Sequence, residues 1–244
     1  MERTKYLLIT LLCSLTLLVW GQSGSSIYRA YATGDMARWK RVMDNLSKEG
    51  QQDKEKQLEI INYQYGYIAW CLGQDNDQEA KRYLSRARKN ISKLEKQGYR
   101  LSQLYAYKAA FIGFEIGLSP YKAPFIGSKS LAFAQQALEL DAQNAMAHVQ
   151  LGNIYSHMPA MMGGSRMKAI QHYQKAIELM EKREQATENW NYLNLLVATI
   201  ETYTALKEYK NAEAYCLKAL TVEPDFKWVK SKLYPEIVKK LSHE

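Results

Sequence analysis

Two stretches of this sequence repeat one pattern at a constant spacing, and this internal repeat restricts the possible folds more than any other feature. Residues 113–141 (GFEIGLSPYKAPFIGSKSLAFAQQALELD) align without a gap with residues 152–180 (GNIYSHMPAMMGGSRMKAIQHYQKAIELM). Pro120 matches Pro159, so the offset is 39 residues. A unit of this length cannot bury its apolar face alone, and therefore it packs against a neighbouring copy. The sequence thus predicts a stack of similar units.

Shorter versions of the unit occur elsewhere in the chain. Tyr203 precedes Ala212 by nine residues, and the same spacing recurs in residues 67–91. In the 39-residue units the matching step, from Tyr155 to Ala169, is fourteen residues. The longer units are therefore the shorter ones with five residues added in a turn. Because Ala, Leu, Glu, Gln and Lys dominate both versions, we expect each unit to be a pair of helices.

This pattern of small, aromatic and alanine positions resembles the tetratricopeptide repeat (TPR) family. Two positions depart from the family pattern, since Ala142 stands where proline is common and Ile200 where a small residue is expected. Glycine or alanine at a helix crossing allows two helix axes to approach to about 8–10 Å. The resemblance rests, in the second long unit and in the last unit, on Gly152, Tyr155, Ala169, Tyr173 and Ala176, and on Tyr203, Ala212, Cys216, Ala219 and Pro224.

The resemblance implies an all-α fold, a right-handed superhelical solenoid of about four TPR-like helix pairs with an N-terminal half-repeat and a C-terminal capping helix. We divide the chain into a signal peptide (1–21), an N-terminal segment with the half-repeat (22–57), the TPR array (58–224) and a C-terminal capping helix (225–244). Pro235 should kink or divide the capping helix. The expected helices span 36–49, 55–73, 77–97, 99–118, 127–141, 144–157, 165–184, 188–205, 209–222 and 226–242.

The first residues have the features of a secretory signal. Arg3 and Lys5 form a charged start, and an apolar stretch then runs from Tyr6 to Trp20. Its length of about 15 residues is short for a membrane span, although an uncleaved anchor is the alternative. We predict cleavage after Gly21 and an exported protein, either periplasmic or secreted.

The chain is basic, with a formal net charge of +8. Most lysines alternate with acidic residues, as expected of solvated helix faces, and an exported protein meets little nucleic acid. We therefore expect no nucleic-acid partner. The final segment, residues 228–244 (WVKSKLYPEIVKKLSHE), is the most basic part of the chain and is the candidate for a peripheral membrane contact.

Sequence motifs for catalysis are lacking. The histidines show no HExxH spacing, no GxSxG elbow occurs, and no cysteine stands beside an obvious base. Cys71 and Cys216 lie in the first and fourth predicted pairs, several helix layers apart, and a disulfide needs Cα atoms within about 7 Å. We predict two free, buried thiols, no enzymatic activity and no cofactor.

A copper site is the most specific alternative to a protein without chemistry of its own. Residues 157–167 (HMPAMMGGSRM) are rich in the soft ligands that copper(I) prefers. Their counterpart in the first long unit, residues 118–129 (LSPYKAPFIGSK), contains none of these ligands. Methionine also commonly fills gaps between packed helices. We therefore interpret both stretches as structural turns and predict no metal site. The candidate copper ligands are His157, Met158, Met161, Met162, Met167 and His172.

In TPR proteins the first helix of each pair lines a concave surface, and the same face can be assigned here by register. Its mixture of aromatic, amide and small residues could hold an extended peptide or an apolar ligand. The N-terminal segment 22–35, which contains Ile27, Tyr28 and Tyr31, could fill this surface instead. The predicted binding residues are Asn62, Tyr65, Tyr107, Phe114, Met146, Asn153, Asn194 and Glu201.

Together these features predict an exported TPR scaffold or adaptor that binds a protein or peptide partner without chemistry of its own. An alternative follows from the long turns with Pro and Gly-Gly-x-x-x-Lys-Ala. Within residues 113–180 they look similar to the TPR subunit of TRAP-type transporters. That resemblance implies a periplasmic transport component that binds an apolar small molecule. The lipid-anchor cysteine expected of that subunit is absent from this sequence.

Overall fold

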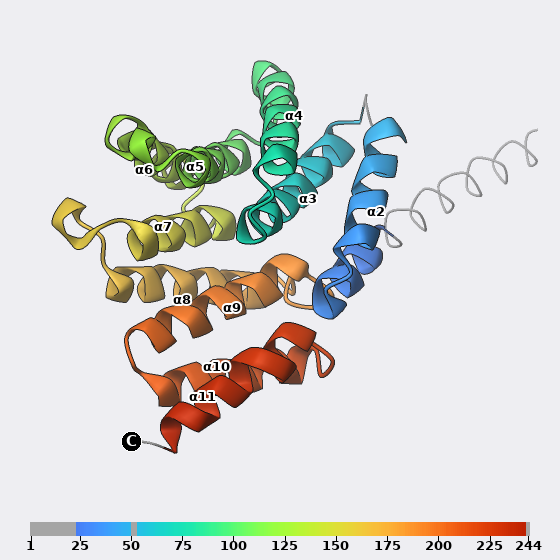
Figure 1. Ribbon diagram of the computed structural model, residues 1–244. Helices are drawn as coiled ribbons and strands as arrows, with labels where there is room; N and C mark the ends of the chain where they lie inside the picture. Colours follow the sequence, from blue (N-terminus) through green and yellow to red (C-terminus); the bar gives the residue numbers. More distant parts are fainter. Residues whose placement is uncertain (1–22, 50–52, 243–244) are drawn as a thin grey trace, which may run out of the picture.

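The computed structural model describes residues 23–49 and 53–242, and it confirms the predicted all-α solenoid (Figure 1). The predicted signal peptide and its cleavage site after Gly21 lie outside these residues. An N-terminal helix at residues 23–33 precedes the array. The longer helices that follow are α2 (Met36–Glu49), α3 (Lys54–Gly73), α4 (Asp77–Lys96), α5 (Leu101–Leu118), α6 (Ala123–Leu140), α7 (Ala145–His157), α8 (Arg166–Lys182), α9 (Trp190–Ala205), α10 (Tyr209–Val222) and α11 (Tyr234–Leu241).

Side-chain caps fix the starts of several helices. Asp53 accepts hydrogen bonds from the backbone N–H groups of Glu55 and Lys56 at the start of α3. Asn144 and Ser165 cap α7 and α8 in the same way. Each cap satisfies an N–H group that the first helical turn leaves without a partner. These polar residues therefore set where the helices of successive pairs begin.

Small residues at the crossings hold the helices of a pair together, as the repeat predicted. Ala169 and Ala176 on α8 are fully buried, as are Ala212 and Ala219 on α10. Gly152 on α7 faces Tyr173 on α8 so closely that an added Cβ would lie 2.2 Å from Cε1 of the ring. This contact requires glycine, because no side chain fits between α7 and the tyrosine.

The two long turns each contain a short 3₁₀ helix, η1 (Pro120–Lys122) and η2 (Ala160–Met162). The backbone conformation of this turn explains why two glycines follow η2. Gly163 has a φ of 96°, and a Cβ on Gly164 would lie 1.8 Å from the carbonyl oxygen of Met158. The turn folds back on itself at these two glycines, which supports its interpretation as a structural connector.

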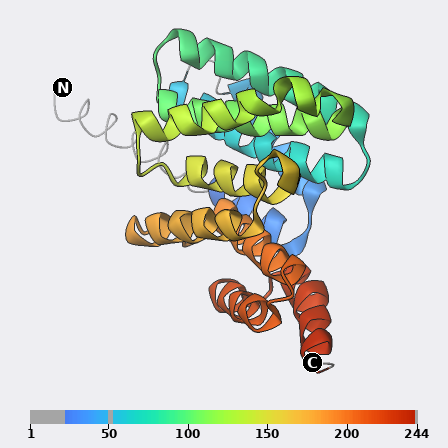
Figure 2. The same cartoon turned by 90° about the vertical axis from the view of Figure 1, so that its left-hand side faces the viewer.

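The array curves so that its N-terminal helices reach the start of α9, while α10 and α11 extend beyond this contact (Figures 1 and 2). Trp39 on α2 contacts Trp190 on α9 edge to face, with ring centroids 4.8 Å apart. Gly66 on α3 makes room for the pair, since a Cβ there would lie 2.6 Å from Trp190 and 2.7 Å from Trp39. Contacts between early and late helices therefore close the array.

The C-terminal end covers the last apolar face. Phe226 and Ile237 are almost completely buried. A five-residue π turn, η3 (Val229–Leu233), precedes α11, and Pro235 lies in the first turn of α11. The helix expected at 226–242 is thus a continuous helical run from residue 227 to residue 241, and the π turn just before Pro235 is its only irregularity within the described residues.

Cys71 and Cys216 are buried and unbonded to each other, as predicted. Burial raises the pKa of the Cys71 thiol to about 11 and that of Cys216 to about 12. Both thiols are therefore protonated at neutral pH. Within residues 23–49 and 53–242, no helix combines the length and hydrophobicity that a bilayer crossing requires.

Candidate ligand-binding groove

The first helices of the four pairs, α3, α5, α7 and α9, form the concave side of the array. A pocket of about 940 Å³ crosses their N-terminal halves. Its apolar floor includes Leu58, Tyr107, Met146, Val149 and Trp190. A volume of this size is within the range of small-molecule sites, and the pocket spans enough helices to hold a short extended segment.

Amide side chains surround the apolar floor of this pocket, among them Asn62, Gln103 and Asn191. Three residues of its wall each carry a buried polar atom that makes no hydrogen bond to the described residues. These atoms are Oδ1 of Asn62, Oδ1 of Asn191 and Nε1 of Trp190. Buried polar atoms nearly always have a partner, so two acceptors and one donor without one are unusual features of a pocket wall.

Charged residues at the rim make the pocket slightly acidic. Four carboxylates (Glu55, Glu59, Asp141 and Glu188) face two guanidinium groups, those of Arg100 and Arg183. Burial raises the pKa of Glu59, although hydrogen bonds from Tyr63 and Ser23 oppose that shift. The rim is therefore suited to a neutral or cationic ligand better than to an acidic peptide tail.

Three of the eight predicted binding residues line this pocket, namely Asn62, Tyr107 and Met146. Tyr107 and Met146 are largely buried in the floor, whereas Asn62 is partly exposed. The structure brings these three together from α3, α5 and α7.

Tyr65 and Phe114 lie instead in the packed middle of the concave side. Their rings stack at a centroid distance of 5.5 Å. Tyr65 is also 5.9 Å from Tyr107 and 6.0 Å from Trp190, and only 4% of its surface is exposed. Tyr65 and Phe114 therefore fill the centre of the concave side behind the pocket floor, and neither residue lines the pocket.

The remaining three predicted residues lie outside the pocket, and two of them make hydrogen bonds within the fold. Asn153 accepts a hydrogen bond from the Tyr173 hydroxyl at 2.8 Å, and Asn194 accepts one from Tyr31 at 2.9 Å. Glu201 is exposed to solvent, but the protein around its carboxyl raises its pKa. The structure does not bring these three into the pocket.

The N-terminal segment occupies part of the concave side, the second of the two possibilities that the sequence left open. Tyr31 of the helix at 23–33 packs against Trp190 and Phe226, with ring centroids 5.7 and 5.5 Å away. Ile27 is fully buried. The segment therefore fills the space beside α9 and leaves the pocket open at the N-terminal ends of the helices.

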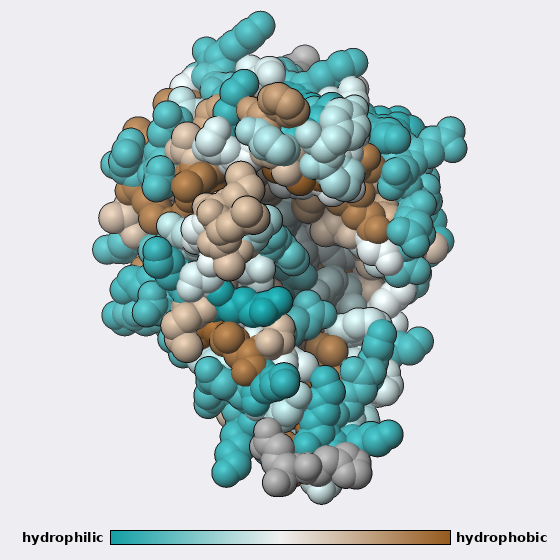
Figure 3. Space-filling view, turned by 60° about the vertical axis from the view of Figure 1, so that its left-hand side comes forward, coloured by the Kyte–Doolittle hydropathy of each residue, from teal (hydrophilic) through white to brown (hydrophobic). Residues whose placement is uncertain are grey.

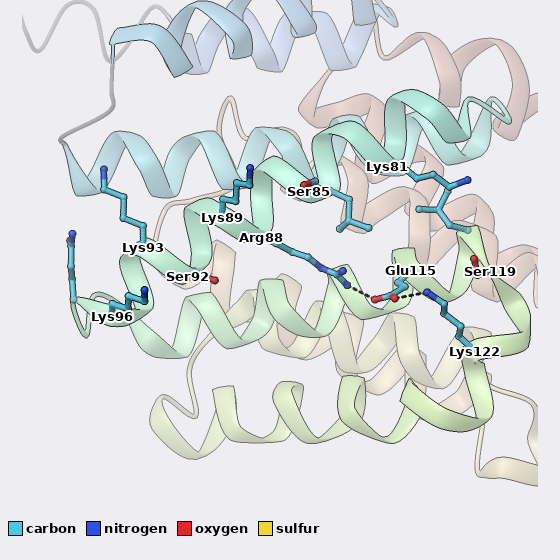
Figure 4. Close-up of a pocket in the computed structure, with 13 residues that line it drawn as sticks. Lys81, Ser85, Arg88, Lys89, Ser92, Lys93, Lys96, Glu115, Ser119 and Lys122 are labelled. Carbon is cyan, nitrogen blue, oxygen red and sulfur yellow. Dashed lines mark hydrogen bonds and ion pairs between the residues drawn. The ribbon is translucent and has the colours of Figure 1, made fainter.

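A second cavity, of about 860 Å³, lies between α4 and α5 and is basic (Figure 4). Arg88 and Lys122 reach Glu115 from opposite sides and pair with it, so the only carboxylate that the described residues place in its wall is neutralised. Hydrogen bonds from Lys122 and Arg88 lower the pKa of Glu115. We call this cavity the basic groove, and it is also lined by Lys81, Lys89, Lys93 and Lys96, together with Ser85, Ser92 and Ser119.

The candidate copper ligands are mostly exposed. Met161 is 94% exposed, Met162 53% and Met167 50%. Nδ1 of His172 lies 3.1 Å from Nδ1 of His148, and the His172 ring stacks on the ring of Tyr155. In the described part of the chain, no group of three or more His, Cys, Asp or Glu side chains has the arrangement of a metal site.

Sequence reasoning missed two features of these surfaces. Trp190 and Asn191 begin α9, directly after the cap Asn189, but nothing local marks them as pocket residues. The basic groove had a readable signal, since residues 81–93 (KRYLSRARKNISK) contain six cations and no acidic residue. All charged residues of that stretch are therefore positive, and they lie on one helix, α4.

No protein-family model and no curated protein sequence matches this chain. Solved structures do resemble it. The HusA haemophore from Porphyromonas gingivalis is 18% identical with a TM-score of 0.59, and the alignment covers 73% of this chain and 92% of HusA. TTC0263, a thermophilic TPR protein from Thermus thermophilus, is 19% identical with a TM-score of 0.54, over 85% and 93% of the two chains. The fold is therefore TPR-like.

Proposed function

We propose that this chain is a non-catalytic TPR-like scaffold, exported as its leader suggests, that binds an extended peptide segment of a partner protein in the concave pocket. The observation that carries the proposal is that three residues of the pocket wall, Asn62, Asn191 and Trp190, each carry a buried polar atom to which the described residues offer no hydrogen bond. A peptide main chain offers N–H donors for the two amide oxygens and carbonyl acceptors for the indole N–H.

The shape and charge of the pocket support the same ligand. It crosses α3, α5, α7 and α9, so a bound segment would run across the helices, and its apolar floor would take alternate side chains. Four carboxylates against two guanidinium groups at the rim favour a segment that is neutral or positively charged.

A binding experiment with paired variants tests the proposal. Peptides selected from a displayed random library with the full chain would be titrated against Asn62→Leu and Asn191→Leu. Each substitution removes a polar atom that lacks a partner, so stability should stay the same or rise while affinity falls. Loss of one hydrogen bond from a buried site corresponds to a fall in affinity of about threefold to tenfold.

Phe114→Leu is the matched control, because Phe114 lies on the concave side outside the pocket. Equal losses of affinity in the Phe114 and Asn variants would contradict the assignment of the site. Unchanged affinity in both Asn variants, with their stability intact, would remove the pocket from peptide binding altogether.

Similarity to a haemophore supports a second candidate, a carrier of a flat apolar small molecule, in line with the alternative of a periplasmic transport component. Tyr107, Met146 and Trp190 offer aromatic and thioether surface in the pocket floor. Titration with haemin, followed by its absorption band, distinguishes the candidates. Saturable binding that Met146→Ala and Trp190→Ala weaken, with no peptide selected from the library, would favour the carrier.

A further inference from the structure

The two long turns hold large apolar side chains out in solvent. Tyr121 in the α5–α6 turn and Phe125 in the first turn of α6 are 73% and 76% exposed. Met161 and Met162 in the α7–α8 turn are 94% and 53% exposed. Both turns lie on the left side of the array in Figure 1 and face the viewer in Figure 2. Protruding apolar residues of this size on neighbouring turns indicate a binding surface.

The short turns of the same array do not share this feature. Residues 74–76 between α3 and α4, and residues 206–208 between α9 and α10, contribute none of the large exposed apolar side chains of the described chain. The five extra residues of each long unit therefore produce two projecting segments, which we call the tips: one contains Tyr121 and Phe125, and the other contains Met161 and Met162. The turned view in Figure 3 shows apolar residues reaching the surface beside a central hollow on this side.

The segments that carry the exposed apolar residues contain charges of one sign. Acidic residues are absent from residues 120–138 and from residues 142–177. Within these stretches Lys129, Arg166 and Lys168 are exposed. Lys122, directly after Tyr121, belongs to the basic groove between α4 and α5, so positive charge continues from the tip along α4 (Figure 4).

We propose that the two long turns form a peripheral binding surface for anionic phospholipid membranes. Tyr121, Phe125, Met161 and Met162 insert at the boundary between headgroups and acyl chains, and the cations around them contact lipid phosphates. Exposed apolar residues combined with basic residues are the combination that interfacial binding requires. This surface is separate from the concave pocket, and its role does not depend on the proposed function.

The alternatives fit the geometry less well. A second copy of this chain on the same surface would bring lysines against lysines, which opposes association. The apolar residues also sit on two separate projecting tips, whereas a protein helix or strand is held in a groove. A fluid bilayer accepts separate tips, and a soluble phosphate would leave the apolar side chains without a role.

Insertion can be measured at a single position with the full chain. Phe125→Trp introduces an indole at one tip, and lipids brominated on their acyl chains quench an indole that inserts. Leu217→Trp on α10, where the native leucine is 48% exposed, is the matched control away from the turns. Subtracting the signal of the parent chain removes the contribution of its own tryptophans, including that of the leader.

We expect extra quenching for Phe125→Trp with phosphatidylglycerol vesicles, little with phosphatidylcholine vesicles, and none for Leu217→Trp. In the Phe125→Trp background, Lys129→Gln with Lys168→Gln should lower the vesicle affinity obtained from the quenching titration about 25-fold, roughly fivefold for each lysine. Met161→Ser with Met162→Ser should weaken it about tenfold or more. Circular dichroism confirms that each variant keeps its helices.

Equal quenching at positions 125 and 217, or quenching that ignores the lipid charge, would overturn the proposal. So would stabilisation by inorganic phosphate without any quenching by vesicles, which would make the basic groove a site for soluble anions. Lys239→Gln with Lys240→Gln tests the membrane contact expected of the C-terminal segment. If these changes abolish quenching at position 125 and the turn variants do not, the turns are not the binding surface.

Discussion

Gly152→Ala should destabilise the protein, whereas the same change at Gly113, its counterpart 39 residues earlier, should not. A Cβ on Gly152 would lie 2.2 and 2.4 Å from two carbon atoms of the Tyr173 ring, so the ring or the helix must shift. Tyr173 is buried, and its hydroxyl donates a hydrogen bond to Asn153 that the shift would strain. Around Gly113 no atom of the described residues lies within 4 Å of an added Cβ, apart from its own helix backbone and chain neighbours.

The magnitude follows from three opposing effects. Overpacking costs about 1–3 kcal/mol, and a weakened hydrogen bond about 0.5–1.5 kcal/mol. Alanine favours a helix interior over glycine by about 1 kcal/mol. The free energy of unfolding should therefore fall by about 1–3 kcal/mol for Gly152→Ala, a loss of roughly 2–12 °C in Tm for a chain of this length. Gly113→Ala keeps only the helix effect and should stabilise by up to about 1 kcal/mol.

Urea unfolding monitored by circular dichroism measures both variants, and an unchanged slope shows that the same surface unfolds in each. Solenoids can unfold in parts, so the midpoints are compared under one protocol. A Gly152 variant as stable as the Gly113 variant would refute the idea that close approach of α7 and α8 holds this pair together.

Three further outcomes follow from the structure. Gly66→Ala should lower the free energy of unfolding, measured from the urea midpoint, by about 1–3 kcal/mol. The added Cβ would meet the indole rings of Trp39 on α2 and Trp190 on α9. Burial lowers the pKa values of His148 and His172. As the pH falls, these histidines are therefore protonated in the unfolded chain before they are protonated in the folded chain. The free energy of unfolding should fall as the pH drops below about 6.5 and level off below the pKa values of the folded chain. Replacing both histidines with glutamine should reduce that loss in urea titrations across this pH range. Cys71 and Cys216 should react with a thiol reagent at neutral pH only as fast as the chain opens, because both thiols are buried and protonated.

The helix pairs could be predicted from the sequence because their packing is local. Spaced alanines specify where the two helices of a pair touch, and both partners lie within one repeat unit. The comparison of glycines shows the limit of this reasoning. Alignment makes Gly113 and Gly152 equivalent, but only Gly152 faces a tyrosine, because the position matching Tyr173 in the first long unit is Ala134.

Closure of the array could not be predicted, because it depends on residues far apart in the chain. Trp39 and Trp190 are separated by three helix pairs, so they meet only because the stack of those pairs curves. The helix at 23–33 was also not predicted as a helix, since its burial comes from α9 and Phe226 rather than from its neighbours in sequence. The pocket shares this origin, because four separate helices build it.

The shared tryptophan links closure to binding. Trp190 lines the pocket on one side and packs against Trp39 and Tyr31 on the other. Its indole N–H is one of the three unpartnered polar atoms that the described residues place in the pocket wall. A ligand that hydrogen-bonds this N–H needs the ring held in place, and the early helices supply that constraint. In the proposed function, the helices at 23–33 and 36–49 therefore provide a wall that is fixed before the ligand arrives, which lowers the entropy lost on binding.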